Sequence, residues 1–455
     1  MSAVAESPAS RPRLWKAFLA FLGPMMLANI LQALSGTINN IYLGQMLGVW
    51  AMASVSAFFP VLFFFISFMI GLGAGASVLI GQAWGAREYE RVKAIAGTTL
   101  SVGIGVGLLV SVFGGWLTGP MLTLLGTPAD ILPGATSYAR IMLIAAPGIF
   151  VFLLATSMMR GVGDTVTPLL TLLISTAIGL ALTPALIRGW GGLPKMGVAS
   201  GAWASVASYG VALVWLGWYM LRRKHPLAPD SVFLHHMNID RAILAKVLRI
   251  GLPTAVQMIT ISLAEVAVLF LVNRFGSNAT AAYGAVNQVV AYVQFPAISI
   301  AITASILGAQ AIGAGRVNSL GAIARTGILM NLFITGGLVV LAYLFSRTIV
   351  GLFITSAPVV DVAQTLLHIM LWSSIIFGMS AVLSGLMRAS GSVLMPTSIS
   401  IFAILAIEVP VAWFLSHRIG LDGIWMSYPV AFVAMLAMQT SYYRLVWRKR
   451  PIRRL

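Results

Sequence analysis

The stretch MRGVGDTVTP at residues 159–168 recurs in degraded form as MRASGSVLMP at residues 387–396, an offset of 228 residues. The same offset relates a series of shorter identities: Gly48 with Gly276, Ala53 with Ala281, Ala76-Ser77 with Ala304-Ser305, Gln82-Ala83 with Gln310-Ala311, Gly85-Ala86 with Gly313-Ala314, and Ile141-Met142-Leu143 with Ile369-Met370-Leu371. So constant a register indicates that one half of the chain is a copy of the other. In an apolar chain this is typical of a transporter built of two similar lobes.

The composition predicts a polytopic membrane protein, because 59% of the 455 residues are hydrophobic and only 9% are charged. Cysteine is absent, which excludes disulfides, a thiolate nucleophile and a Cys-ligated metal. The net charge of +17 comes from basic residues that lie almost wholly in loops and tails. Nucleic acid is therefore not expected as a partner, whereas the lipid bilayer is. The apolar run after Lys16 is too long for a signal-peptide core and predicts a retained first helix.

Twelve apolar segments are long enough to cross a bilayer, which takes about 20 helical residues. They cover residues 16–43, 50–82, 92–118, 132–158, 166–188, 196–221, 244–273, 280–311, 318–345, 358–386, 394–416 and 422–446. We predict an all-α integral membrane protein with two six-helix lobes, residues 16–221 and 244–446, joined by a cytoplasmic linker, 222–243. A tail at 1–15 precedes them and a basic tail at 447–455 follows. An even number of spans per lobe makes the repeat parallel.

The basic residues predict the orientation, because 22 of the 28 fall on the side that holds the two termini and five on the other. Lys and Arg are enriched on the cytoplasmic side of membrane proteins. We therefore expect a plasma (inner) membrane protein with both termini cytoplasmic. The repeated polar segments then form inner turns, which serve either as a cytoplasmic gate or as helix ends anchored by basic residues.

Several short motifs together resemble those of the multidrug and toxic compound extrusion (MATE) transporters. They are Gly23-Pro24, Gly251-Leu252-Pro253, Gly81-Gln82-Ala83-Trp84-Gly85-Ala86, the stretch 159–168, and Gly423-Ile424-Trp425. The resemblance covers essentially the whole chain. It implies a monomer with two six-helix lobes around a central cavity, which rock to exchange organic, often cationic, amphiphilic compounds for protons or sodium ions. No cofactor besides the coupling ion is implied.

The sequence departs from this family at two places in the first lobe and at one in the second. Many members carry an Asp fifteen residues after the first Pro, where this chain has Asn39. Many members also carry an Asn and an Asp ahead of a later Pro, and this chain has Gly179 and Thr183 at those positions. Some members carry an Asp in the segment that corresponds to 358–386, where this chain has the apolar run Ile375-Ile376-Phe377. A coupling mechanism that uses those positions cannot be transferred, so how the first lobe works stays open.

Glu265 and Glu408 are the acidic residues that lie well inside predicted spans. A charge at a helix centre costs roughly 2.5–3.5 kcal/mol, so both are candidates for ion coupling. A partly desolvated carboxyl can hold a proton and release it when a cavity opens, and a carboxylate such as Glu265 could instead coordinate sodium. The alternative is a protonated or hydrogen-bonded structural acid. Pro410 should bend its helix and free the Ala406 carbonyl. No other metal site is expected.

Polar residues at helical spacing supply candidates for the substrate cavity. Asn29, Gln32, Ser35 and Asn39 share one face, which either lines a cavity or packs against a neighbouring helix. Gln257 shares the face of Glu265, and further polar residues follow in the next segment. The cavity candidates are Gln32, Ser35, Asn39, Gln257, Asn287, Gln288 and Tyr292.

Two alternative functions remain open at this point. A flippase for a lipid-linked precursor would need a cationic cavity, and the membrane interior offers little beyond Arg140. The other alternative is a channel or scaffold without coupled transport. The repeat and the buried acids argue against it, because they favour coupled transport. Enzymatic activity is not expected, because the sequence shows no nucleophile, phosphate-binding loop or metal cluster, and its five His residues are scattered.

Overall fold

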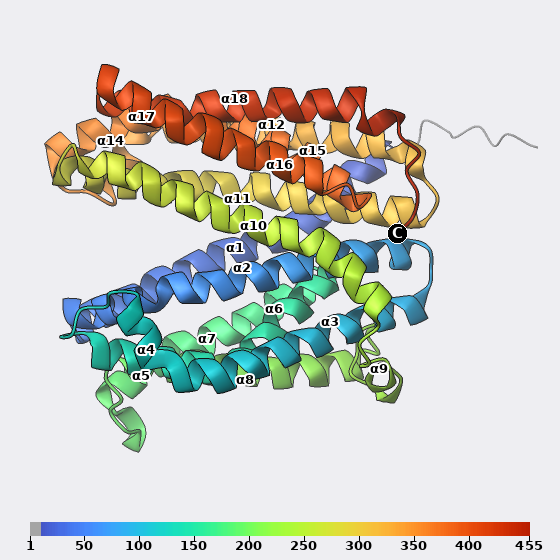
Figure 1. Cartoon of the computed structure of the whole chain (residues 1–455), viewed down its shortest axis with the longest axis horizontal. Coiled ribbons are helices and arrows are strands. Elements are labelled where there is room, and N and C mark those ends of the chain that lie inside the picture. The colour runs from blue at the N-terminus through green and yellow to red at the C-terminus, as the bar shows by residue number, and fades with distance from the viewer. Residues whose placement is uncertain (1–10) are drawn as a thin grey trace, which may run out of the picture. The chain divides into compact units, whose positions relative to one another are not determined.

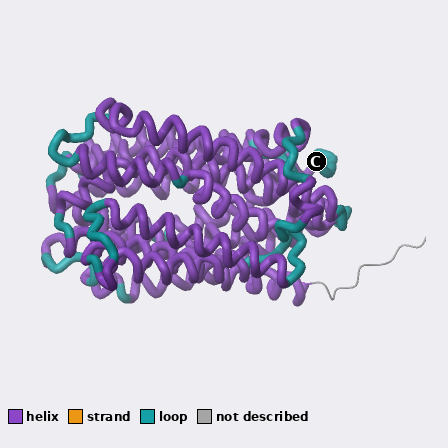
Figure 2. Tube along the Cα trace, turned by 90° about the horizontal axis from the view of Figure 1, so that it is seen from below, coloured by secondary structure: helices purple, strands orange, loops and turns teal. Residues whose placement is uncertain are grey.

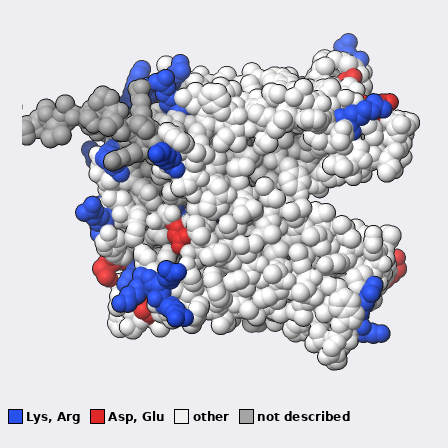
Figure 3. Space-filling view, turned by 180° about the vertical axis from the view of Figure 1, so that it is seen from behind, with Lys and Arg blue, Asp and Glu red and all other residues white. Residues whose placement is uncertain are grey.

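The computed structural model describes residues 11–455, which form helices and no strand (Figures 1 and 2). Residues 1–10 of the predicted N-terminal tail lie outside the described residues. Figure 2 shows that the loops gather at the ends of the helices. Figure 3 shows the same division in the charges: Lys and Arg gather at the ends, and the long flanks between them carry almost no charge on the face shown. This pattern suits helices whose flanks face lipid.

The helices of the first half follow one another with short connections. They are α1 (Arg11–Met46), α2 (Val49–Gly85), α3 (Tyr89–Leu109), the π-helical turn η2 (Val110–Gly114), α4 (Gly115–Leu124), α5 (Leu132–Ile144), α6 (Ala146–Gly161), α7 (Val166–Arg188), η3 (Trp190–Gly192), α8 (Ala199–Arg222) and α9 (Ser231–His235). The second half repeats this order. Its helices are α10 (Arg241–Asn273), α11 (Ser277–Gly313), η4 (Val317–Ser319), α12 (Leu320–Leu344), α13 (Ser346–Gly351), α14 (Ala357–Met370), α15 (Ser373–Ala389), α16 (Leu394–Phe402), the π-helical turn η5 (Ala403–Glu408), α17 (Val409–Arg418), α18 (Leu421–Leu445) and η6 (Trp447–Lys449).

The twelve predicted spans are confirmed as apolar elements, but two of them are not single helices. Ten helices among the described residues are long and apolar enough to cross a membrane. The predicted spans 132–158 and 358–386 are each a pair of helices, α5 with α6 bent by 56° and α14 with α15 bent by 42°. At the second bend the Tyr343 hydroxyl donates to the His368 carbonyl at 3.1 Å and accepts from the Trp372 N–H at 3.0 Å. It thereby replaces a broken helical hydrogen bond.

The stretch that repeats in sequence also repeats as a turn. After α6, Gly163 has φ 95° and its N–H bonds to the Arg160 carbonyl at 2.9 Å. After α15, Gly391 has φ 80° and its N–H bonds to the Arg388 carbonyl, also at 2.9 Å. Glycine adopts this left-handed conformation without steric cost, which is why it closes helices in this way. The internal repeat is therefore structural as well as sequential.

The chain folds into two compact units whose boundaries fall inside helices. The N-terminal unit is Leu27–Ala255, and the C-terminal unit comprises Val256–Leu455 together with the described residues up to Met26. These boundaries differ from the predicted lobes, 16–221 and 244–446. Both crossings come two residues after a proline, Pro24 in α1 and Pro253 in α10. Proline removes a hydrogen bond from the helix interior, so the helix is weakest at these points.

Within the N-terminal unit, the first part of α10 packs directly on α2. A Cβ added to Gly251 would lie 2.6 Å from the carbonyl oxygen of Gly71, and one added to Gly71 would meet the Gly251 oxygen in turn. Gly75 contacts the Val247 carbonyl in the same way. Within the C-terminal unit, the first part of α1 packs likewise, with Phe18 fully buried beside Gly327. The first part of α10 thus belongs to the N-terminal unit, and the first part of α1 belongs to the C-terminal unit.

The linker 222–243 is attached to the N-terminal unit rather than free. Thr98 on α3 donates to the Asn238 carbonyl at 3.1 Å and accepts from the Asp240 N–H at 3.3 Å. His225 lies 3.2 Å from the Asp164 carboxylate, which also accepts from the Thr167 N–H at the start of α7. Burial by itself would raise the pKa of Asp164, but these hydrogen bonds outweigh it and hold the pKa below its usual range.

Candidate functional site

Glu408 sits at a backbone irregularity inside the C-terminal unit. It ends the π-helical turn η5, where the Val409 N–H bonds to the Ile404 carbonyl five residues back. Pro410 follows in the first turn of α17 and cannot donate a helical hydrogen bond. Short π-helical turns in long helices occur often at functional sites. The Glu408 side chain is only 4% exposed, so a carboxyl group is held inside the apolar core of the unit.

Glu265 on α10 lies close enough to Glu408 for their charges to interact. Its side chain is exposed, unlike that of Glu408. The two acids therefore lie in one region of the C-terminal unit, with Glu265 exposed and Glu408 enclosed. Two interacting carboxyl groups resist double ionisation, so such a pair binds a proton or another monovalent cation readily.

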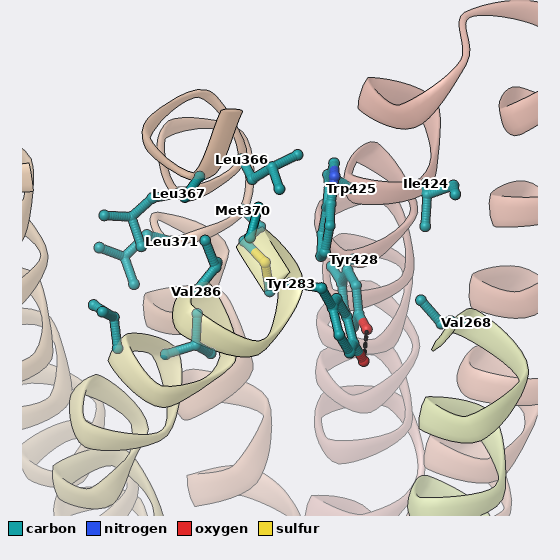
Figure 4. Close-up of a cluster of buried hydrophobic side chains, with 14 of the residues drawn as sticks. Val268, Tyr283, Val286, Leu366, Leu367, Met370, Leu371, Ile424, Trp425 and Tyr428 are labelled. Carbon is teal, nitrogen blue, oxygen red and sulfur yellow. Dashed lines mark hydrogen bonds between the residues drawn. The ribbon is translucent and has the colours of Figure 1, made fainter. Parts of the chain in front are cut away.

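Two tyrosines complete the surroundings of the acids (Figure 4). The hydroxyls of Tyr283 on α11 and Tyr428 on α18 lie 3.5 Å apart, and either one can donate. Tyr283 also hydrogen-bonds with the Asn287 side chain, and both tyrosines interact electrostatically with Glu265 and Glu408. The region therefore holds two carboxyls, two hydroxyls and an amide.

An apolar cluster packs around the two tyrosines. The Trp425 ring packs against the Tyr283 ring (Figure 4). Their centroids lie 5.1 Å apart, and Trp425 is fully buried. Buried aliphatic side chains from α11, α14 and α18 complete the cluster, among them Val286, Leu367, Met370 and Ile424. This packing keeps water from the Glu408 side, where the low local dielectric strengthens every charge interaction.

Of the other cavity candidates in the C-terminal unit, one is linked to the polar group around the acids. Asn287 joins the cluster through Tyr283. Tyr292 is half-buried and its ring packs against Phe295, with centroids 5.6 Å apart. Gln257 is half-buried and Gln288 is exposed. Their role in a substrate path stays a prediction.

The N-terminal unit presents its candidates differently. On α1, Gln32 is exposed, while Ser35 and Asn39 are half-buried. The Asn39 side-chain oxygen is buried and has no hydrogen-bond partner among the described residues. On α7, the Thr183 hydroxyl donates to the Gly179 carbonyl at 2.8 Å, so its hydrogen bond lies within its own helix. No three His, Asp or Glu side chains meet as a metal site in the described part of the chain.

The sequence singled out both acids as candidates but not the two tyrosines. Tyr283 lies four residues before Asn287, so the two share a helical face, and that spacing could have indicated it. Tyr428 carried no such signal, because its partner lies 145 residues away in the sequence. Arg140, the basic residue named above for the membrane interior, donates from Nε to the Gly115 carbonyl at 3.2 Å.

Comparison with known proteins identifies the family. The MatE family model matches residues 24–185 and 253–414, so each half of the chain carries one copy. The chain belongs to this family, the multidrug and toxic compound extrusion transporters, and is a multi-pass membrane protein. The relationship suggested by the sequence motifs is thereby confirmed.

Individual relatives agree with this assignment over nearly the full length. The chain is 45% identical over 448 residues to the probable multidrug resistance protein YoeA of Bacillus subtilis, covering 98% of this chain and 97% of that protein. It is 23% identical to the multidrug export protein MepA of Staphylococcus aureus, covering 94% and 93%. Among solved structures, the Vibrio cholerae MATE transporter VcmN matches with a TM-score of 0.89 at 20% identity, covering 97% and 99%. A MATE transporter in complex with MaD3S matches with a TM-score of 0.87 at 22% identity, covering 97% and 99%. The fold is that of MATE transporters.

Proposed function

We propose that this chain is a secondary active multidrug exporter that exchanges organic, cationic amphiphilic compounds for protons or sodium ions. The names of its relatives support multidrug export, and the pair Glu265 and Glu408 supports ion coupling. We place the protein in the plasma (inner) membrane of a bacterium. Both termini then lie in the cytoplasm, in line with the distribution of basic residues. The protein acts as a monomer.

The main support for a role in ion coupling is the difference in solvent exposure between the two carboxyl groups. Glu408 is enclosed beside Tyr428, whereas Glu265 is exposed. An ion that enters reaches Glu265 first and is shared with Glu408, whose enclosed position favours the neutral or ion-bound form. Opening of the site toward the cytoplasm then releases the ion. Binding of a cationic substrate competes with the ion for the same negative charge.

Transport in proteoliposomes tests this proposal. Wild type should expel a fluorescent organic cation when either a proton or a sodium gradient is imposed, and the effective gradient names the ion. Glu265→Gln and Glu408→Gln should each abolish the gradient-driven component, since glutamine keeps the side-chain volume and removes the charge. Glu90→Gln serves as a matched control, because the Glu90 side chain is 74% exposed.

The outcomes separate the coupling role from the function. If both glutamine variants transport at the wild-type rate, the acids do not couple transport. If neither gradient moves any cation through the folded wild type, multidrug export itself is wrong, and a lipid-linked precursor becomes the substrate to test. Ion conductance in planar bilayers without a gradient-coupled flux would instead indicate a channel.

A further inference from the structure

A second site lies at one end of the N-terminal unit, apart from the acids. It is a cavity of about 580 Å³ where α2 ends, α3 begins and α8 ends. The residues of its lining used below are Trp84, Tyr89, Lys93, Lys224, His225 and Asp230. By the distribution of basic residues, this is the end of the unit that meets the cytoplasmic surface of the membrane.

The cavity lining has more positive than negative charge, since Lys93 and Lys224 face the single carboxylate of Asp230. Lys93 and Lys224 make no ion pair with any described residue, whereas the carboxylates near them are engaged. Asp230 accepts from the Phe233 N–H at 2.7 Å and so caps α9. His225 has both ring nitrogens occupied, Nε2 toward Asp164 and Nδ1 accepting from the Leu227 N–H at 3.1 Å. The two lysines are therefore the groups free to meet an anion.

The backbone under one of these lysines is unusual. Lys224 has φ 50°, and its turn closes α8 with the His225 N–H bonded to the Met220 carbonyl at 2.9 Å. Glycine normally occupies this position of a helix-closing turn, because other residues have a conformational cost there. Besides Lys224, Arg87 is the other non-glycine residue with positive φ in the described chain, and it lies in the turn that carries Trp84 and Tyr89. The repeat equivalent of Arg87 is Gly315, with φ 74°.

Two positive-φ positions at this end thus hold basic residues, and at one of them, Arg87, the other half has glycine. Such strain persists where a site needs the side chain. The cavity also has an aromatic wall, since the Trp84 and Tyr89 rings meet edge to face with centroids 5.2 Å apart. Tryptophan and tyrosine are enriched at the headgroup level of membranes. The combination of two free lysines and two interfacial aromatics suits a phosphate group with an organic substituent.

We propose that this cavity binds a phosphate-bearing anion, with the phosphate on Lys93 and Lys224 and its substituent against Trp84 and Tyr89. The source that suits its position is the headgroup of an acidic phospholipid, because basic pockets between helices on the cytoplasmic side accept such headgroups. A free phosphate ion has the same chemistry and would come from the cytoplasm. The site does not depend on the coupling role of the acids.

Binding of phosphatidylglycerol to the purified full-length protein in detergent, measured by native mass spectrometry, tests the site. Lys93→Gln/Lys224→Gly should bind about twenty-five-fold more weakly, since each basic residue near a membrane surface contributes about fivefold. The matched control is Arg316→Gln/Arg325→Gln, which removes two exposed basic residues from the C-terminal unit and should change binding less than twofold. Lys224→Gly alone should melt no lower than wild type, because glycine relieves the positive φ.

Competition with inorganic phosphate identifies the source of the anion. If phosphate leaves phosphatidylglycerol bound, the lipid headgroup is the ligand. If phosphate displaces the lipid from wild type and binds more weakly to the lysine variant, the anion site stands with a soluble ligand. Equal lipid binding by wild type and the lysine variant would overturn the proposal, as would an equal loss in the arginine control.

Discussion

The contact between α2 and the first part of α10 makes a sharp prediction about Gly251. An alanine Cβ there would lie 2.6 Å from the Gly71 oxygen and 2.9 Å from its carbonyl carbon, where ordinary contacts begin at 3.4 Å. The two backbones would have to separate by about 0.8 Å, and neither can move away as a flexible side chain would. Overpacking of this kind costs about 1–3 kcal/mol, against a gain of about 1 kcal/mol from replacing a helical glycine.

Gly105 on α3 provides the matched control in the same unit. It is also a glycine inside a helix, but a Cβ added there meets nothing within 4 Å. Gly105→Ala should therefore gain the helical preference of alanine without the clash, about 1 kcal/mol. Thermal unfolding of the purified proteins should then show shifts of opposite sign. For a unit of this size each kcal/mol corresponds to about 2–4 °C.

Opposite shifts in melting temperature would support the direct packing of α10 on α2. If Gly251→Ala raises the melting temperature as much as Gly105→Ala does, the two backbones are not in contact, and the assignment of residues 241–255 to the N-terminal unit is wrong. A larger residue at position 251, such as valine, should deepen the loss, because its extra methyl groups meet the same carbonyl.

Three further predictions concern polar contacts. Asp164→Asn should lower the melting temperature at pH 7 and make the melting temperature decrease less as the pH is lowered. The reason is that the pKa of Asp164 is lower in the folded protein than the unfolded value of about 3.9, so the carboxylate contributes stability above that value and loses it as pH falls through the folded pKa. Melting curves across pH measure this. Thr98→Val should expose the linker, so that trypsin cleaves at Arg241 about thirtyfold faster, because two hydrogen bonds of about 1 kcal/mol each are lost. Tyr428→Phe removes the hydroxyl that meets Tyr283, and gradient-driven efflux should fall about fivefold while the melting temperature changes little; wild-type efflux would contradict this.

The sequence predicted the spans well, because the length of an apolar run is a direct measure of what can cross a bilayer. It did not predict the bends between α5 and α6 or between α14 and α15, since apolarity reports length and not straightness. The second bend depends on the Tyr343 hydroxyl, which comes from another helix. Tertiary contacts of this kind leave no local pattern.

The division into units was predicted less well for a related reason. The constant offset of 228 residues shows which residues of the two halves correspond. It does not show which of the two units each segment packs against. The small residues Gly71, Gly75 and Gly251 were the available signal, because close helix packing in membranes favours small residues. The two acids were predictable from the cost of a buried charge. Their tyrosine partners were not, since Tyr283 and Tyr428 meet only in the folded unit.

The two halves share a fold but have diverged in their polar residues. The C-terminal unit holds Glu265 and Glu408, whereas the corresponding region of the N-terminal unit has Asn39 and a Thr183 hydroxyl that bonds within its own helix. If the acids couple transport, the ion is handled by one unit alone. Movement of that ion then alters contacts in the C-terminal unit, and the chain crosses to the other unit only through α1 and α10 near Pro24 and Pro253. Substitutions at these two crossings therefore test whether the covalent connections take part in coupling between the units.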